Sequence, residues 1–257
     1  MANYDNQARY GTVTGAGVGA IDQGLRAHML RVYNYMAVGL VLTGLAAFFG
    51  YSAAITTTPT PYAIHAGEYL TDFGYALFVS PLKWVVIFAP LAFVLFLGFR
   101  VAKMSVAAAQ ATFWAYAALV GLSLSSIFLV YATQSIAQVF FVTAAMFGAT
   151  SLWGYTTQRD LTGMGSFLMM GLIGIIIASV VGFFLQSSAL QWAISVLGVV
   201  IFTGLTAYDT QKIKEMYYVA DDGTVAGRKA IMGALSLYLD FINLFLMMLR
   251  LFGNQRN

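Results

Sequence analysis

Seven apolar runs of membrane-crossing length dominate the sequence and restrict what the chain can fold into. A helix needs roughly 17–25 mainly apolar residues to cross about 30 Å of hydrocarbon. The sequence therefore predicts an all-α fold, a polytopic membrane protein with a seven-helix transmembrane bundle. The predicted spans are Tyr33–Tyr51, Leu82–Phe99, Ser105–Tyr131, Ile136–Tyr155, Gly163–Leu185, Leu190–Tyr208 and Ile231–Phe252.

The composition agrees with a membrane protein and excludes several other classes. Hydrophobic residues make up 60% of the chain and charged residues 9%, whereas soluble domains carry about 25% charged residues. The chain has no cysteine, which excludes disulfides, thiol catalysis and cysteine-based metal sites. The basic residues are scattered, so nucleic acid is not an expected partner. We expect two parts: residues 1–32, a polar cytoplasmic tail with a short amphipathic helix over Asp22–Arg31, and residues 33–257, the transmembrane domain.

Lysine and arginine are distributed unevenly between the two sides of the predicted bundle. Cytoplasmic loops of membrane proteins carry an excess of these residues. The side with the N-terminus holds Arg9, Arg26, Arg31, Arg100, Lys103, Arg159, Lys212, Lys214, Arg228 and Lys229, against Lys83 alone on the other side. We therefore expect a cytoplasmic N-terminus. Seven full crossings place Arg250 and Arg256 outside, mildly against the rule, so the side of the C-terminus stays open at this point.

Asp209 and Asp240 are the two acidic residues that the predicted helices carry at membrane depth. A carboxylate at the bilayer centre costs roughly 2.5–3.5 kcal/mol on insertion scales. If the sixth helix continues to about Glu215, Asp209 lies roughly 9 Å from its end, and Asp240 lies roughly 13–14 Å beyond Ile231 in the seventh. The two carboxyl groups can therefore reach a similar level on adjacent helices.

Polar neighbours extend both acids into a seam. Ser236, Asp240, Asn243 and Met247 are spaced i, i+4, i+7 and i+11, which places them on one stripe of a helix. Thr206 lies three residues before Asp209 on the sixth span. Such a seam faces other helices or water rather than lipid.

Two neighbouring carboxylates in a medium of low dielectric constant do not easily both ionise, so the pair tends to share a proton. Such a pair can sense pH, and when deprotonated it offers hard oxygen ligands suited to Ca²⁺. The alternative is that each aspartate only caps or hydrogen-bonds a neighbouring helix. Because acids at membrane depth usually have a function, we favour the functional interpretation.

A single long loop, residues 52–81, holds the spacing H-x-x-E at His65 and Glu68. This spacing can bind a metal ion. The loop is rich in threonine and proline, so we favour a solvated surface loop over a metal site.

The end of the sequence resembles the Bax inhibitor-1 family of membrane proteins, also called the transmembrane BAX inhibitor motif family. The resemblance rests on "AYDTQKI", which closes the sixth span, and on "ALSLYLDFINLFLMMLRLFG" in the seventh. Hydropathy extends it over roughly residues 20–257. It implies a bundle in which the C-terminal helix is central and the other six surround it, in a bacterial inner membrane.

The resemblance also implies a function and site residues. Family members are associated with a pH-sensitive Ca²⁺ leak across membranes, and eukaryotic ones with suppression of cell death. Asp209 and Asp240 match the paired aspartates that act as pH sensor and gate. A basic residue near the end of the second helix can pair with them, and Arg100 is the nearest match, although its spacing to the third span differs. Ca²⁺ is the expected permeant or bound ion, and no cofactor is expected.

Two other function classes stay open. An intramembrane aspartyl protease also uses two aspartates, but it needs Gly-x-Gly before the second, where this chain has Leu-Tyr-Leu before Asp240. We therefore do not expect an enzyme. Some bacterial relatives associate with a membrane-bound AAA protease, and the polar tail Met1–Arg31 is the segment that such a partner would engage.

Overall fold

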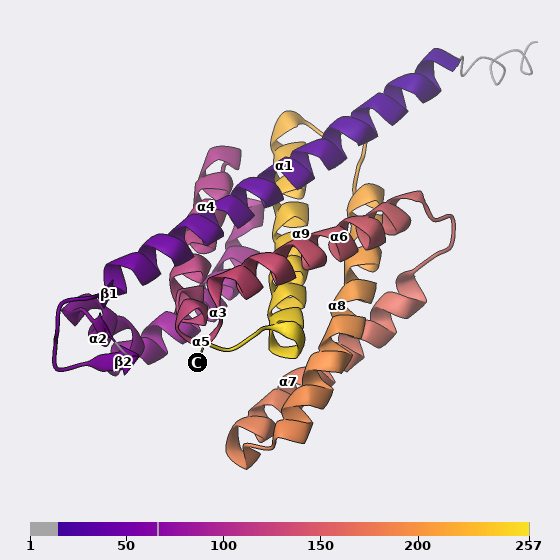
Figure 1. Cartoon of the computed structure of the whole chain (residues 1–257). Coiled ribbons are helices and arrows are strands. Elements are labelled where there is room, and N and C mark those ends of the chain that lie inside the picture. The colour runs from indigo at the N-terminus through magenta and orange to yellow at the C-terminus, as the bar shows by residue number, and fades with distance from the viewer. Residues whose placement is uncertain (1–14, 66, 257) are drawn as a thin grey trace, which may run out of the picture.

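The computed structural model describes residues 15–65 and 67–256 and contains, within them, seven helices long and apolar enough to cross a membrane (Figure 1). All seven predicted spans are confirmed. The elements are α1 Gly15–Ala54, β1 Ile55–Thr56, β2 Ala63–His65, β3 Glu68–Leu70, α2 Asp72–Phe78, α3 Leu82–Arg100, the 3₁₀ turn η1 Val101–Lys103, α4 Val106–Leu124, α5 Ile127–Val130, α6 Thr133–Thr156, α7 Thr162–Leu185, α8 Ser188–Glu215 and α9 Gly223–Phe252.

Two helices begin earlier than the hydropathy predicts. The segment Asp22–Arg31 is not a separate short helix, because it forms part of the continuous 40-residue α1 and buries Met29 in the core. No proline interrupts the chain between this segment and the first span. Helix α9 begins at Gly223 because Asp222 caps it, its carboxylate accepting hydrogen bonds from the backbone N–H groups of Thr224 and Val225. Hydropathy indicates where contact with lipid begins, whereas these two helices begin before the segment that contacts lipid.

Helix α9 lies at the centre of the bundle, as the family resemblance implies. In the apolar 18-residue stretch of α9, 72% is buried inside the protein, whereas the corresponding share in the other six spans is between 11% and 33%. It packs against α8, α1, α6 and α4 (Figure 1). Tyr238 of α9 is fully buried and its hydroxyl lies 2.7 Å from Thr43 Oγ1, which in turn donates to the carbonyl of Ala117 at 2.9 Å. These hydrogen bonds connect α9 with α1 and α4.

Close helix contacts depend on glycine at two places. A Cβ atom added at Gly121 of α4 would overlap the carbonyl oxygen of Thr43 in α1. One added at Gly154 of α6 would overlap the carbonyl oxygen of Ala207 in α8. Lipid tails are as apolar as hydrophobic side chains, so the hydrophobic effect does not drive helices together within a membrane. Small residues instead let helix backbones approach closely and pack. The second contact fixes α8 two residues before Asp209.

The loop between α1 and α3 folds into a small sheet with strand order β1-β3-β2, in which both pairings are antiparallel. The C-terminal segment after α9 returns to this side of the bundle. It pairs with the end of α5 through the backbone hydrogen bonds Ala132 N–H to Asn254 O (3.0 Å) and Arg256 N–H to Val130 O (2.9 Å). Helix α9 therefore spans the bundle from one end to the other, and residues 254–256 lie beside the loop.

Arg256 lies on the side of the bundle that is poor in basic residues, and a carboxylate there neutralises its charge. Its guanidinium group binds both carboxylate oxygens of Glu68, at 2.9 and 3.1 Å, and the hydroxyl of Tyr51 at 2.5 Å. The hydrogen bonds to Tyr51 and Glu68 raise the pKa of Arg256 above its usual value. Glu68, considered above for a metal site with His65, is thus the carboxylate partner of an arginine.

We predict that cysteine labelling will report the side of each loop, because the chain has no cysteine of its own. With the N-terminus in the cytoplasm, a membrane-impermeant maleimide should label Thr58→Cys in intact cells. It should label Gln158→Cys, in the α6–α7 connection, only after permeabilisation. The unmodified protein is the control, and the reverse labelling pattern would contradict the orientation.

We also predict that the contact between Arg256 and Glu68 stabilises the fold. Glu68→Gln should lower the free energy of unfolding by about 1 kcal/mol, the upper end for a partly exposed ion pair, because the contact is bidentate. The thermal midpoint should fall by about 2–4 °C. Glu215→Gln, which removes an exposed carboxylate at the opposite end of the bundle, is the control. Equal midpoints for the two variants would show that the contact adds no stability.

Candidate functional site

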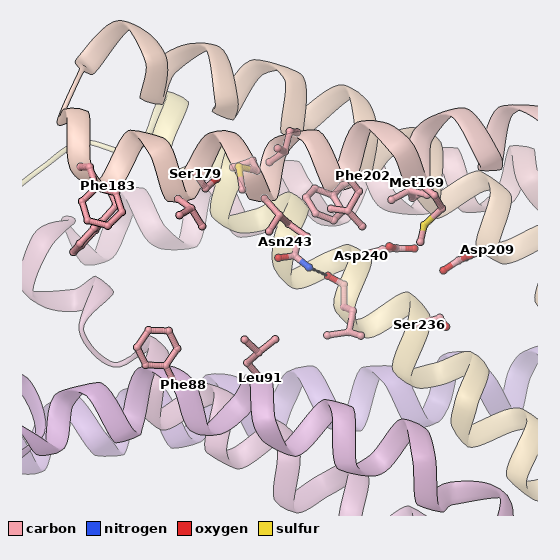
Figure 2. Close-up of a pocket in the computed structure, with 18 of the residues that line it drawn as sticks. Phe88, Leu91, Met169, Ser179, Phe183, Phe202, Asp209, Ser236, Asp240 and Asn243 are labelled. Atoms are coloured by element: carbon pink, nitrogen blue, oxygen red, sulfur yellow. Dashed lines mark hydrogen bonds between the residues drawn. The ribbon is translucent and has the colours of Figure 1, made fainter.

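Asp209 of α8 and Asp240 of α9 face the same cavity, which has a volume of about 850 Å³ (Figure 2). Their carboxyl groups are close enough to interact electrostatically with each other. The structure therefore brings together the two acids that the sequence placed at a similar level on adjacent helices. Among the described residues that line this cavity, they are the only ionisable ones.

The two carboxyl groups differ in their surroundings. The Asp240 side chain is only 6% exposed, and its Oδ2 atom has no hydrogen-bond partner among the described residues. Asp209 is half-buried, two turns before the end of α8. A buried polar atom without a partner costs roughly 1–3 kcal/mol. While both carboxyl groups are ionised, Asp240 therefore reduces the stability of the fold, and a proton shared with Asp209 offsets this cost. Such a cost is typical of a residue retained for function.

The predicted polar stripe of α9 forms one wall of the cavity. Ser236, Asn243 and Met247 line it together with Asp240. The Asn243 amide donates to the carbonyl of Leu239 at 2.8 Å, which leaves its oxygen available as an acceptor (Figure 2). Thr206, by contrast, is fully buried away from the cavity, and its hydroxyl donates to the carbonyl of Phe202 at 2.7 Å. Thr206 is thus part of the helix core and not of the seam.

Helices α3 and α7 supply the remaining, apolar walls. Phe88 and Leu91 of α3 lie across the cavity from Met169 and Phe183 of α7 (Figure 2). Helix α3 packs mainly against α4 and α2, whereas α7 packs mainly against α8. The cavity thus lies between two helix groups, with the aspartates at the side where α8 meets α9.

Arg100 does not join the aspartates in this structure. It is exposed at the last position of α3 and lies outside the residues that line the cavity. The cation whose charge acts on Asp209 is Lys212, three residues later on α8. Arg100 ends helix α3, which packs mainly against α4 and α2, whereas the aspartates lie on α8 and α9.

A hydrogen-bonded set beside Asp209 was not found from the sequence. The Tyr33 hydroxyl of α1 lies 2.7 Å from Ser151 Oγ of α6, which lies 2.8 Å from Thr210 Oγ1 of α8. One residue further on, the Gln211 side chain accepts from the N–H of Leu161 and donates to the carbonyl of Arg159, each at 2.8 Å. These contacts hold the end of α8 and so position Asp209. These hydrogen bonds join segments that are distant in the sequence, so the residue pattern of a single helix does not indicate them.

The acidic and histidine residues do not form a preformed metal cage. In the described part of the chain, no group of three or more His, Asp or Glu side chains gathers at one point. Ca²⁺ takes six to eight oxygen ligands in its usual sites, and the cavity offers two carboxyl groups, the Asn243 oxygen and the Ser236 hydroxyl. This donor set fits a cation that keeps much of its water shell. Of the polar tail, residues 1–14 lie outside the described residues.

Comparison with known proteins places this architecture among bacterial membrane proteins. Residues 25–257 match the family model described as Inhibitor of apoptosis-promoting Bax1. The inner membrane protein YbhL of Escherichia coli K12 is 48% identical over 91% of this chain and 94% of its own length. An uncharacterized protein of Rickettsia prowazekii is 49% identical over 92% of this chain and 93% of its own. An uncharacterized membrane protein of Streptococcus pyogenes is 36% identical over 90% of this chain and 94% of its own.

The unpaired Asp240 oxygen leads to a stability prediction. At a pH at which both carboxyl groups are ionised, Asp240→Leu removes a buried polar atom without a partner, so the free energy of unfolding should rise by about 1–3 kcal/mol. Thermal unfolding of the purified protein measures it. Leu244→Ala, a fully buried position one turn later, should instead lose about 2–5 kcal/mol. A loss of the same size in Asp240→Leu would mean that the carboxyl group has a structural partner.

Proposed function

Because the chain belongs to the Bax inhibitor-1 family of membrane proteins, we propose that it is a Ca²⁺-permeable leak channel whose opening depends on the protonation of Asp209 and Asp240. The observation that carries the proposal is the meeting of these two carboxyl groups at one cavity, with one oxygen of Asp240 buried and unpaired. The proposal assigns the pair a role in ion passage and no enzymatic step.

The physical basis is the interaction of α8 with α9. When the two carboxyl groups share a proton, they attract each other across the contact between these helices. When both are ionised, like charges in a medium of low dielectric constant repel. No other ionisable residue among those described lines the cavity, and Lys212 acts on Asp209 from the same helix. The protonation state of the pair therefore changes the force between the two helices that bound the cavity.

Permeation follows from the same groups. Deprotonated carboxylates attract a divalent cation, and a set of few protein ligands lets the ion leave again. The aromatic and aliphatic side chains of α3 and α7 line the cavity beside the pair. An ion that reaches the pair therefore passes between walls that belong to different helix groups, since α3 packs mainly against α4 and α7 mainly against α8.

The proposed location is a bacterial inner membrane with the N-terminus in the cytoplasm. The E. coli relative is named as an inner membrane protein. Ten basic residues on the N-terminal side against Lys83 in the opposite loops support the orientation.

We predict that Asp209→Asn and Asp240→Asn will each change how Ca²⁺ flux depends on pH. The measurement is flux into liposomes that contain the purified protein and a Ca²⁺ indicator, taken across a pH series. Each variant should shift the midpoint by about one pH unit or flatten the curve, because a neutral amide cannot share the proton.

Asp160→Asn is the matched control, since it removes a carboxylate in the exposed α6–α7 connection. Hydrogen bonds from Thr162 lower the pKa of Asp160, so this group stays ionised around neutral pH. Its flux curve should match that of the unmodified protein. Unchanged curves in both Asp209→Asn and Asp240→Asn would overturn the gating role of the pair.

A further inference from the structure

A second cavity, of about 480 Å³, lies where the C-terminal end of α9 meets the start of α8. Unlike the aspartate cavity, it is rich in polar side chains and contains no acidic one among the described residues that line it. Arg250, in the last turn of α9, is its only cation. The side chains that surround the arginine with hydrogen-bonding groups are those of Ser188, Gln191, Ser195 and Gln255.

Arg250 is exposed and has no carboxylate partner among the described residues. The two salt bridges found in the described part of the chain are Lys229 with Asp221 and Arg256 with Glu68. The two arginines near the C-terminus therefore differ: Arg256 is neutralised by Glu68, whereas the charge of Arg250 is left for a partner outside the chain. A guanidinium group with neutral hydrogen-bonding neighbours suits a phosphate group, which it can bind through two oxygens.

The two cavities adjoin. Ser179 and Phe183 of α7 line both of them. On α9, Arg250 follows Met247 by three residues, so the stripe that carries Asp240 and Asn243 continues to the arginine. Arg250 lies ten residues beyond Asp240, about 15 Å along the helix, or half the thickness of the hydrocarbon core. Together the cavities form a groove with a polar, positively charged end and a long apolar part.

We propose that this groove binds one anionic phospholipid, with its phosphate at Arg250 and one acyl chain along α7 and α9 toward Asp240. The charge and the dimensions match: a cationic end at the depth of the headgroups, then apolar walls that reach the middle of the bilayer. An apolar groove in contact with lipid gains dispersion contacts when an acyl chain fills it. Trp192, exposed beside Arg250, is the residue type that gathers at the headgroup level.

A lipid with no positive charge of its own fits this end better than a zwitterionic one. No acidic side chain among the described residues of the second cavity receives the amine of a zwitterionic headgroup, whereas Arg250 gains from an added negative charge. An acyl chain in the groove also occupies the cavity that the aspartates face. That last consequence rests on the proposed function, but lipid binding itself does not depend on it.

Native mass spectrometry of the full-length protein tests the binding without any flux measurement. The probes are phosphatidylglycerol and phosphatidylcholine with identical acyl chains, and inorganic phosphate alone. We expect one phosphatidylglycerol to be retained per chain, with phosphatidylcholine retained less. Arg250→Gln should weaken phosphatidylglycerol binding by about tenfold or more, the effect of losing one charge-assisted hydrogen bond. Equal retention of the two lipids, or an unchanged affinity in Arg250→Gln, would overturn the proposal.

Two further variants separate the headgroup from the acyl chain. Arg159→Gln removes one exposed positive charge in the α6–α7 connection, away from both cavities, and should bind phosphatidylglycerol as the unmodified protein does. Ser179→Trp, at the exposed wall that the two cavities share, should reduce retention by filling the groove. Full retention of the lipid by Ser179→Trp would show that the acyl chain does not occupy the groove, which contradicts the proposal. Displacement of the lipid by millimolar phosphate, or a loss in Arg159→Gln equal to that in Arg250→Gln, would overturn a specific lipid site.

Discussion

The enclosure of α9 by the other helices is the constraint on which the rest of the structure depends. A carboxyl group in contact with lipid is costly, and a central helix is the place where neighbouring helices can surround one. Helices α1, α4, α6 and α8 surround α9. Glycine lets α4 approach α1 and α6 approach α8, and the hydrogen bond of Thr43 with Tyr238 joins α1 to α9. The stripe from Ser236 to Met247 is left facing a cavity instead of a helix.

Function and stability oppose each other at Asp240. Its unpaired oxygen reduces stability, whereas the hydrogen bonds beside Asp209, from Tyr33 through Ser151 to Thr210, hold α8 in place. Proteins commonly lose stability at the residues they use. The proposed proton-sharing pair and the proposed lipid groove, which carry opposite charges, lie along the same two helices. The groove positions a negatively charged headgroup at one end and two acids half a bilayer away.

Much of this arrangement could be predicted from residue patterns, because hydropathy and periodicity are local properties. They predicted the seven spans and the stripe on α9, although the sixth predicted span ended at Tyr208 and α8 continues to Glu215. They failed where the answer depended on helix ends or on contacts between distant segments. The cap at Asp222 is a local signal that hydropathy overlooks, and Thr206 had the right spacing but faces the core.

The sequence by itself determined that the chain crosses a membrane seven times and that Asp209 and Asp240 are its two acids at membrane depth, since apolar length and charge set those properties. The tertiary structure alone decided which groups meet. It placed Arg256 on Glu68, left Arg250 unpaired beside a polar cavity, and kept Arg100 away from the aspartates. These outcomes depend on how packed helices rotate and cross. The contacts join residues that are far apart in the sequence, so they produce no periodic pattern along the chain.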